Sequence, residues 1–496
     1  MKFTLAAASL ALLVGSIGGT TATTAAEPTP AVTIRAVGPD RQAEAVIGLF
    51  RGARAAHPAA ALAAWKRASR EPGRLGKPLE AAIAAINPRM AGELRSLEGA
   101  EVSLWFEPEG GKLAWGITLP NDDGTFAALA PALALSGGAA EPPIDGRAVD
   151  RLGGPGSALM LRARGPGGLA IAGSREGLRF VGGRPRPPEG DRRGVPASGW
   201  LARVDPAGLA GSPSIAVRRL AEAIRALGCR EVSVSAGLED AKLSAIASGS
   251  FVADPGGHAE VDPAWVDWIP ADRPMAAIAA AIDPRPEAWE AAFALADRVE
   301  RVDPARAGLA PIRLRLDLAA RAAGVRTEVD VLPHLRGVSG WVGSDGRGID
   351  AALVALHLGD EGAAIRLVTR ARPSTLAGRA LRLDRRGATV LIAWGEGVLE
   401  RSVEAKGRPD RSAGPAIRAR WAGPPPDRAG AVWPARVPGI VPGGSPLATA
   451  LGSAPPILWA GQRSGDLVAD AISWHGLDAL VRRFLDLIPL DPPPDR

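Results

Sequence analysis

Apolar residues recur along the chain with two distinct periods, which predict strands and helices in alternation. Extended apolar runs occur at 32–37 and 275–282, and each is followed by a turn and an amphipathic segment. In the second amphipathic segment Trp289, Phe293 and Ala296 recur at helical spacing, with charged residues between them. This pattern predicts a helix with one face on a core.

Short turns join several neighbouring apolar runs, as between 101–106 and 113–119 and between 380–383 and 389–394. Strands joined in this way must be antiparallel, because a parallel pair needs a crossover of about a dozen residues or more. We therefore predict an α+β fold. It consists of two tandem related units, each a mostly antiparallel sheet with helices packed on one face.

Repeated phrases are the basis for predicting two units. Gly99 and Gly110 return as Gly337 and Gly348, each displaced by 238 positions, and a tryptophan follows the first glycine of each pair. The same order of strand, glycine-rich turn, strand and acidic helix start surrounds both copies. A shared order of elements at a fixed displacement indicates an internal duplication.

A second match sets the extent of the units. The phrase at 158–165 returns at 380–387 with a smaller displacement, because a Pro/Gly-rich insert at 136–155 has no counterpart. We predict a first unit at 27–260 and a second at 261–496, closed by the C-terminal amphipathic segment.

Several carboxylates are expected to begin helices or turns rather than to catalyse. Asp205, Asp283 and Asp303 each precede a proline, which is typical of a helix N-terminus. Asp122 and Asp360 precede glycine-containing amphipathic segments and are predicted to be caps as well.

Residues 1–26 have the pattern of a cleaved secretory signal peptide. Lys2 is followed by an apolar run from Phe3 to Ile17 and by small residues up to Ala26. An uncleaved anchor is the alternative, although the glycines keep the run short of the roughly 20 residues that span a bilayer. The single cysteine, Cys229, lies far from this segment, so lipoprotein processing is excluded. We expect export to the periplasm or the extracellular space, with no transmembrane span after cleavage.

Composition agrees with a folded exported chain. Of 496 residues 46% are hydrophobic, and the formal net charge is +6. One cysteine allows no intramolecular disulfide, so core burial must stabilise the fold.

The phrase Ile269-Pro270-Ala271-Asp272, before an apolar strand and an amphipathic helix, resembles uncharacterised exported bacterial proteins built from Pro-Ala-Asp-led strand and helix units. The first unit lacks this phrase, since its opening strand follows Pro28-Thr29-Pro30. The resemblance implies export and the element order, and it carries no catalytic residues.

Motifs of the common enzyme classes are absent from the sequence. No serine lies in the pattern G-x-S-x-G of serine hydrolases. The phosphate-binding motifs G-x-x-x-x-G-K-[ST], and G-x-G-x-x-G between a strand and a helix, are absent as well. The five histidines are scattered without the spacing of a helical metal site. We expect no cofactor and no nucleic-acid partner, and we favour a non-enzymatic protein.

The segment that connects the two predicted units is rich in residue types that bind metal ions. Oxygen and imidazole donors at this density could hold a divalent cation, and a solvated linker is the alternative. The candidate ligands are Asp254, His258, Glu260 and Asp262.

Positive charge is concentrated in the second half of the chain. Residues 370–436 carry fourteen Lys or Arg against six Asp or Glu. Such a stretch could bind an anionic polymer or lipid headgroups, and a solvated arginine-rich surface is the alternative. The candidate binding residues are Arg382, Arg385, Arg386, Arg418, Arg420 and Trp421.

The sequence therefore favours an exported envelope protein that binds or scaffolds through its paired units. If the units enclose a groove, Trp105 and Trp341 would mark it. A hydrolase or metal-dependent enzyme with a site assembled from distant residues is the alternative, and anionic-polymer binding through 370–436 is a third possibility. The partner is unknown, with an envelope protein or an anionic polymer as candidates.

Overall fold

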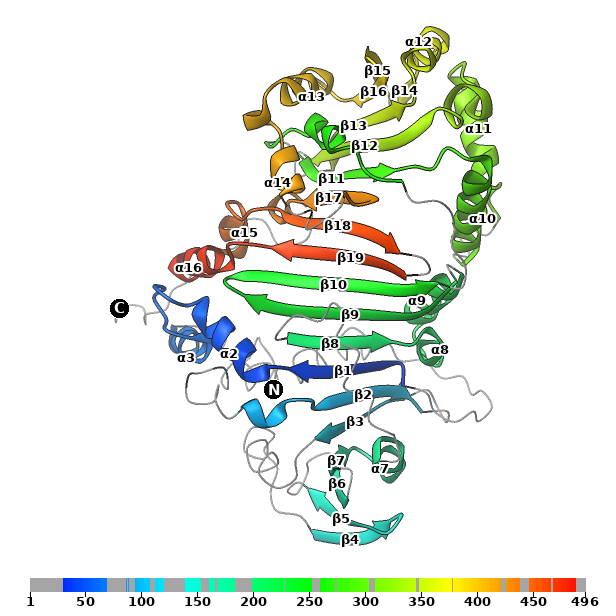
Figure 1. The fold of residues 1–496 in the computed structure, drawn as a ribbon. Helices are drawn as coiled ribbons and strands as arrows, with labels where there is room; N and C mark the ends of the chain where they lie inside the picture. Colours follow the sequence, from blue (N-terminus) through cyan, green and yellow to red (C-terminus); the bar gives the residue numbers. More distant parts are fainter. Residues whose placement is uncertain are drawn as a thin grey trace. The chain divides into compact units, whose positions relative to one another are not determined.

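The computed structural model, whose helices and strands are labelled in Figure 1, divides into two compact units. The first comprises residues 1–225, 229–249 and 476–496, and the second comprises 226–228 and 250–475. The structure describes residues 30–68, 86, 88, 94–107, 112–119, 139–152, 160–165, 168–182, 199–226, 228–251, 259–272, 274–302, 308–344, 348–376, 378–419, 421, 425–437, 446–464 and 467–487.

The first unit is built on an antiparallel sheet. Its strands follow the order β10-β9-β8-β1-β2-β3-β7-β6-β5-β4. They are β1 (Val32–Val37), β2 (Glu101–Phe106), β3 (Leu113–Leu119), β4 (Ala139–Ile144), β5 (Arg147–Leu152), β6 (Met160–Gly165), β7 (Gly168–Ala172), β8 (Gly199–Val204), β9 (Cys229–Glu239) and β10 (Lys242–Phe251).

Helices of the first unit pack on both faces of this sheet. Leu178 of α7 packs with Trp105 on one face, whereas Leu209 of α8 and Ala221 of α9 pack with Ile34 on the other. The helices are α2 (Pro39–Gly48), α3 (Pro58–Ala68), α7 (Arg175–Gly182), α8 (Pro206–Leu209), α9 (Ile215–Ala226) and α16 (Leu477–Leu487), with a 3₁₀ turn η1 (Leu94–Leu97).

Specific polar contacts fix elements of the first unit. The buried Gln42 amide on α2 both donates to the Leu238 carbonyl and accepts from the Leu238 N–H, each at 3.0 Å. Asp240 and Ala241 join β9 to β10 with positive φ angles of 45° and 58°. Two such residues are typical of a type I′ hairpin turn, whose twist matches that of the strands.

The second unit is also built on an antiparallel sheet. Its strands follow the order β19-β18-β17-β11-β12-β13-β16-β15-β14. They are β11 (Pro274–Ala281), β12 (Leu335–Ser344), β13 (Ile349–Leu358), β14 (Thr375–Leu376), β15 (Arg379–Arg386), β16 (Thr389–Trp394), β17 (Arg428–Val432), β18 (Ile457–Ser464) and β19 (Leu467–Trp474).

Its helices are α10 (Pro286–Val302), α11 (Ile312–Ala322), α12 (Glu361–Arg370), α13 (Val398–Gly407), α14 (Gly414–Arg418) and α15 (Pro446–Leu451). Shorter helical segments are the 3₁₀ helix η2 (Pro263–Trp268), the π-helix η3 (Thr327–Val331), and the 3₁₀ turns η4 (Pro409–Arg411) and η5 (Pro434–Arg436).

Helices also cover both faces of the second sheet. On the face that we call inner, Trp341 and Leu353 pack against η2, α13 and α14. On the opposite, outer face, Leu356 packs against α12 and its neighbours. Successive strand residues point to opposite faces, and both sets are apolar here. The expectation of helices on one face is therefore wrong for both units, while the α+β class is confirmed.

Several predicted elements form as expected. Strands β2 and β3 have the predicted bounds, and Asp205 and Asp360 cap α8 and α12 through backbone N–H groups. Asp283 does not cap α10, which begins at Pro286; its Oδ1 accepts from the Arg285 N–H in the preceding turn. Asp122 and Asp303 lie outside the described residues.

Other elements differ from expectation. The insert at 136–155 contributes β4 and β5, which extend the first sheet. The C-terminal helix α16 belongs to the first unit, where Leu485 packs with Ala55 and the Leu477 N–H donates to Ala241. Among the described helices, none is long and apolar enough to cross a membrane.

Candidate functional site

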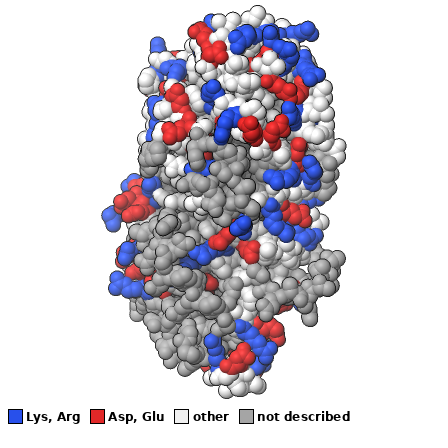
Figure 2. All heavy atoms as spheres, turned by 45° about the vertical axis from the view of Figure 1, so that its right-hand side comes forward, with Lys and Arg blue, Asp and Glu red and all other residues white. Residues whose placement is uncertain are grey.

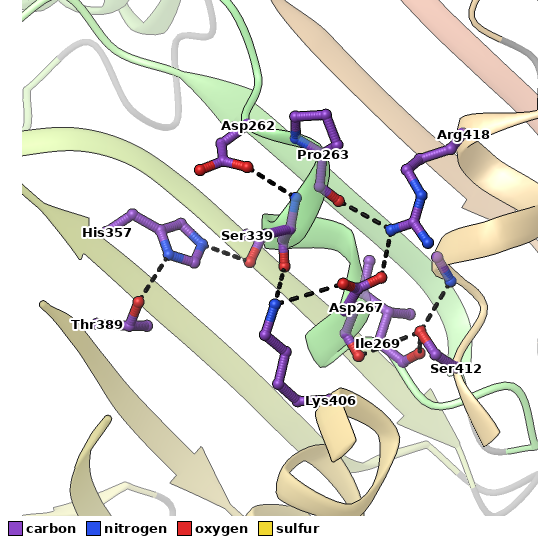
Figure 3. A network of polar contacts seen from close by, with 12 residues as sticks. Asp262, Pro263, Asp267, Ile269, Ser339, His357, Thr389, Lys406, Ser412 and Arg418 are labelled. Atoms are coloured by element: carbon purple, nitrogen blue, oxygen red, sulfur yellow. Dashed lines mark hydrogen bonds and ion pairs between the residues drawn. The ribbon is translucent and has the colours of Figure 1, made fainter. Parts of the chain in front are cut away.

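A polar network lies on the inner face of the second unit, beneath the short helix η2 (Figure 3). The indole of Trp265 on η2 stacks on the His357 ring, with centroids 4.6 Å apart and planes 3° apart. The Trp265 indole can occupy this position because Gly337, on the neighbouring strand, has no side chain. A Cβ there would lie 2.0 Å from the Trp265 ring.

His357 bridges three strands of the sheet. Its Nε2 lies 2.8 Å from the Ser339 hydroxyl on β12, and its Nδ1 lies 3.1 Å from the Thr389 hydroxyl on β16. The imidazole is 3% exposed and Ser339 is 0% exposed. Burial, together with the smaller effect of the charge on Lys406, lowers the pKa of His357 to about 3. The ring is therefore neutral at physiological pH.

Asp267 anchors the other end of η2. Its carboxylate accepts from Lys406 Nζ on α13 at 3.3 Å and pairs with Arg418 on α14. The same two cations donate to backbone carbonyls of η2, Lys406 to Ala264 and Arg418 to Pro263, each at 2.9 Å. These bonds satisfy the carbonyls of a short helix and hold it between the sheet and the two helices.

Ser339 and His357 are the residue types of a catalytic nucleophile and its general base. Their environment, however, does not suit that reaction. A general base works best with a pKa near the operating pH, and a pKa of about 3 makes the ring a weak proton acceptor. The third member is the Thr389 hydroxyl rather than a carboxylate. With Ser339 fully buried, this arrangement orders the core and offers no approach for a substrate.

The two predicted marker tryptophans are core residues. Trp105 is buried under α7 and contacts Phe180, with ring centroids 4.4 Å apart. Trp341 is buried under α13, where its Nε1 donates to Ser402 at 3.0 Å. Each indole lies in the core of its own unit, so neither leaves a face free for a ligand. The expectation that they mark a binding groove is withdrawn.

The predicted arginines are held in ion pairs. Arg382 pairs with Glu400 at 2.6 Å, Arg386 pairs with Asp384 at 2.9 Å, and Arg385 pairs with Glu361. Blue and red side chains accordingly lie interspersed on the face that Figure 2 shows.

Two further candidates of the basic stretch lie near α14. Arg418 belongs to the network around Asp267. Trp421 is half-buried against the inner core, and Arg420 lies outside the described residues.

The candidate metal ligands are not brought together in the described part of the chain. Asp254 and His258 lie outside it, and Glu260 is exposed. Asp262 caps η2, with its Oδ1 accepting from the Ala264 N–H at 2.8 Å. No group of three or more His, Cys, Asp or Glu side chains suited to a metal ion occurs among the described residues.

An apolar row crosses the outer face of the second sheet. The strand register places one residue from each of eight strands in this outer row: Ile472, Trp459, Gly430, Ile278, Gly340, Val354, Ile392 and Leu383. Ile278 is 47% exposed and Val354 is 40% exposed. The indole of Trp459 lies over Gly430, where a Cβ would be 2.6 Å from its Nε1.

Sequence reasoning missed both this row and the His357 network. Each depends on the register between strands far apart in the chain. The available signal was the near-continuous apolar sequence of β11 and β13, which places apolar residues on both faces of the sheet instead of one.

No family model, curated protein or solved structure matches the chain.

Proposed function

We propose that the chain is an exported, non-catalytic binding protein derived from duplication of one α+β unit, and that its second unit binds a polypeptide partner. Eight strands follow the same order in both units, with β1, β2, β3, β7 and β6 in the places of β11, β12, β13, β16 and β15. Helices α7 and α13 follow the same hairpin in each unit and cover the corresponding tryptophans. The repeated glycine phrases support the same origin.

One observation carries the binding proposal. Ile34 pairs with Val102 in the first sheet as Ile278 pairs with Gly340 in the second, on the face away from α7 or α13. Ile34 is 2% exposed, whereas Ile278 is 47% exposed. Helix α12 and its neighbours cover only part of the outer face, and the row at Ile278 and Val354 stays in contact with water. Sheet surface in contact with water is normally polar, so exposed apolar residues there are typical of an interaction surface.

The partner is a polypeptide because the row ends on β15. Leu383, its last member, belongs to β15, whose outer side pairs with β14 only at Arg379 and Ala380, so that backbone N–H and C=O groups farther along β15 face outward. Such groups are best satisfied by another peptide backbone.

An apolar dye tests the surface directly. We expect bis-ANS to bind the full protein, and the pair of substitutions Ile278→Ser and Val354→Thr to remove most of its fluorescence. Leu316→Ser is the matched control, since Leu316 on α11 has the same 47% exposure as Ile278. An equal loss in the control and the row variant would contradict a specific surface.

The enzymatic alternative has its own test. Ser339→Ala and His357→Gln should leave partner binding intact, and neither should change any hydrolytic activity on ester or peptide substrates. A hydrolysis rate that falls with Ser339→Ala while the fold is retained would favour the alternative.

A further inference from the structure

We propose that the outer edge of β15 binds an extended segment of a partner protein in which acidic and apolar residues alternate, adding it to the sheet as an antiparallel strand. This inference rests on the proposed function and names the chemistry of the partner.

The edge of β15 has backbone groups available for a further strand. On one side β15 pairs with β16 through Leu381–Arg386, and on the other side β14 pairs only with Arg379 and Ala380. The Leu381 N–H donates outward to Ser374 at 2.8 Å. Because backbone groups alternate in direction along a strand, those of Leu383 and Arg385 face the same side. Within the described part of the chain, these outward groups have no hydrogen-bond partner.

The first unit has a paired strand at the position that corresponds to the outer edge of β15. There β6 has the position that β15 has in the second unit, and it is flanked by β5 along Met160–Ala163. Beyond β5 lies β4, where Pro142 and Pro143 have no N–H to donate and so protect the sheet edge. In the second unit only the two-residue strand β14 lies beside β15. A strand supplied by another protein would complete the same pattern.

Side chains on β15 determine which sequence fits. Arg382, Asp384 and Arg386 belong to the face of α13, since Arg382 pairs with Glu400 of that helix and Arg386 pairs with Asp384. These three residues carry two positive charges and one negative charge, so this face of the strand is positive. Leu381 and Leu383 belong to the outer face and end its apolar rows. An added strand is therefore favoured when acidic residues lie opposite the arginines and apolar residues opposite the leucines. In the first unit the register places Asp150 of β5 at the position opposite Arg162 of β6.

The present ion pairs of these arginines do not prevent binding. Arg382 and Glu400 are 55% and 57% exposed, and Arg386 is exposed to a similar degree. Exposed pairs contribute about 0–1 kcal/mol, so an arriving carboxylate can replace an existing partner at low cost. Arginines at a sheet edge can also act only to prevent aggregation, and the experiment must separate that role from binding.

The test uses the full protein and a short fluorescent peptide in which Val and Glu alternate, followed by fluorescence anisotropy. We expect saturable binding that weakens about tenfold with the pair Arg382→Glu and Arg386→Glu, as the loss of two charge pairs implies. Arg408→Glu is the matched control, because Arg408 is exposed and pairs with Glu404 at the end of α13. Leu383→Pro, which removes an outward N–H, should abolish binding.

Two further peptides keep the test decisive if Leu383→Pro fails to fold. A peptide with N-methyl groups on its bonding edge should not bind, and one with Lys in place of Glu should bind far more weakly. Equal binding of the N-methylated peptide, or of poly-glutamate without alternation, would overturn strand addition in favour of anionic-polymer binding. No binding of any peptide would also overturn it; if bis-ANS binding still depended on Ile278, the proposed function would stand.

Discussion

The two units share an order of eight strands and differ in what covers and borders each sheet. In the first unit the row through Ile34 is buried by α8 and α9, and β5 and β4 continue the sheet beyond β6. In the second unit η2 covers the inner face, the row through Ile278 is exposed, and β15 is bordered only by β14. The strand order alone thus does not decide which face is core. The segments inserted between strands decide it.

The largest expected effects are at the two tryptophans, which are buried in both units. Trp105→Ala and Trp341→Ala should each lower the free energy of unfolding by about 3–5 kcal/mol, because each removes a buried indole from its own core. Urea unfolding followed by circular dichroism measures both. An effect under about 1 kcal/mol for either variant would mean that its indole is not a core residue.

Isoleucines on the corresponding face of the two sheets should respond unequally to the same change. Ile34→Thr should destabilise by about 2 kcal/mol, since it places a hydroxyl in a buried apolar site. Ile278→Thr should stay within about 0.5 kcal/mol, as expected for an exposed position. Paired thermal unfolding of the two variants checks this. Equal losses would remove the distinction between the two faces.

The helix η2, which covers the inner face of the second unit, depends on Gly337. Gly337→Ala should cost about 1–3 kcal/mol by forcing Trp265 off the His357 ring. Gly348→Ala is the control, because a Cβ there meets no atom within 4 Å. Near-ultraviolet circular dichroism reports the indole environment. An unchanged spectrum in Gly337→Ala would contradict the assigned packing.

Acid should weaken the second unit through His357. Its folded pKa of about 3 lies below the ordinary value of 6.5, so between these values the unfolded chain binds a proton that the folded chain does not. Stability is therefore full above about pH 6.5 and falls by up to about 1.4 kcal/mol per pH unit toward pH 3. His357→Gln should reduce this slope. Identical slopes in the variant and the parent protein would contradict a neutral buried imidazole.

The sequence predicted the elements whose pattern is local. The alternation in β2 and β3, the short turn between β15 and β16, and the helical spacing of α10 are all properties of neighbouring residues. Helix α11 was not predicted, because Ile312 to Leu318 alternate apolar and polar residues as a strand does. No residue of α11 is buried. Its sequence therefore lacks an apolar face at helical spacing, which is the pattern that predicts a helix.

The candidate sites were harder to predict for a physical reason. His357 contacts Ser339 and Thr389 only because of the register of three strands. Trp265, which stacks on His357, belongs to a segment more than seventy residues earlier in the chain. The sequence identified the arginines of β15 by their charge. Their ion-pair partners lie on α12 and α13, and a count of charges along the chain does not show which residues these partners are. Burial of Trp105 and Trp341 likewise follows from helices that pack over them.

Hydrogen exchange at the β15 edge tests the central claim most directly. In the full protein alone, the outward amides of Leu383 and Arg385 should exchange fast, while the amides of Arg382 and Asp384, which face β16, should be protected. Adding the alternating Val/Glu peptide should slow exchange at Leu383 and Arg385 without changing the first unit. Protection of these two amides in the free protein, or no change at saturating peptide, would contradict binding of a partner strand by the second unit.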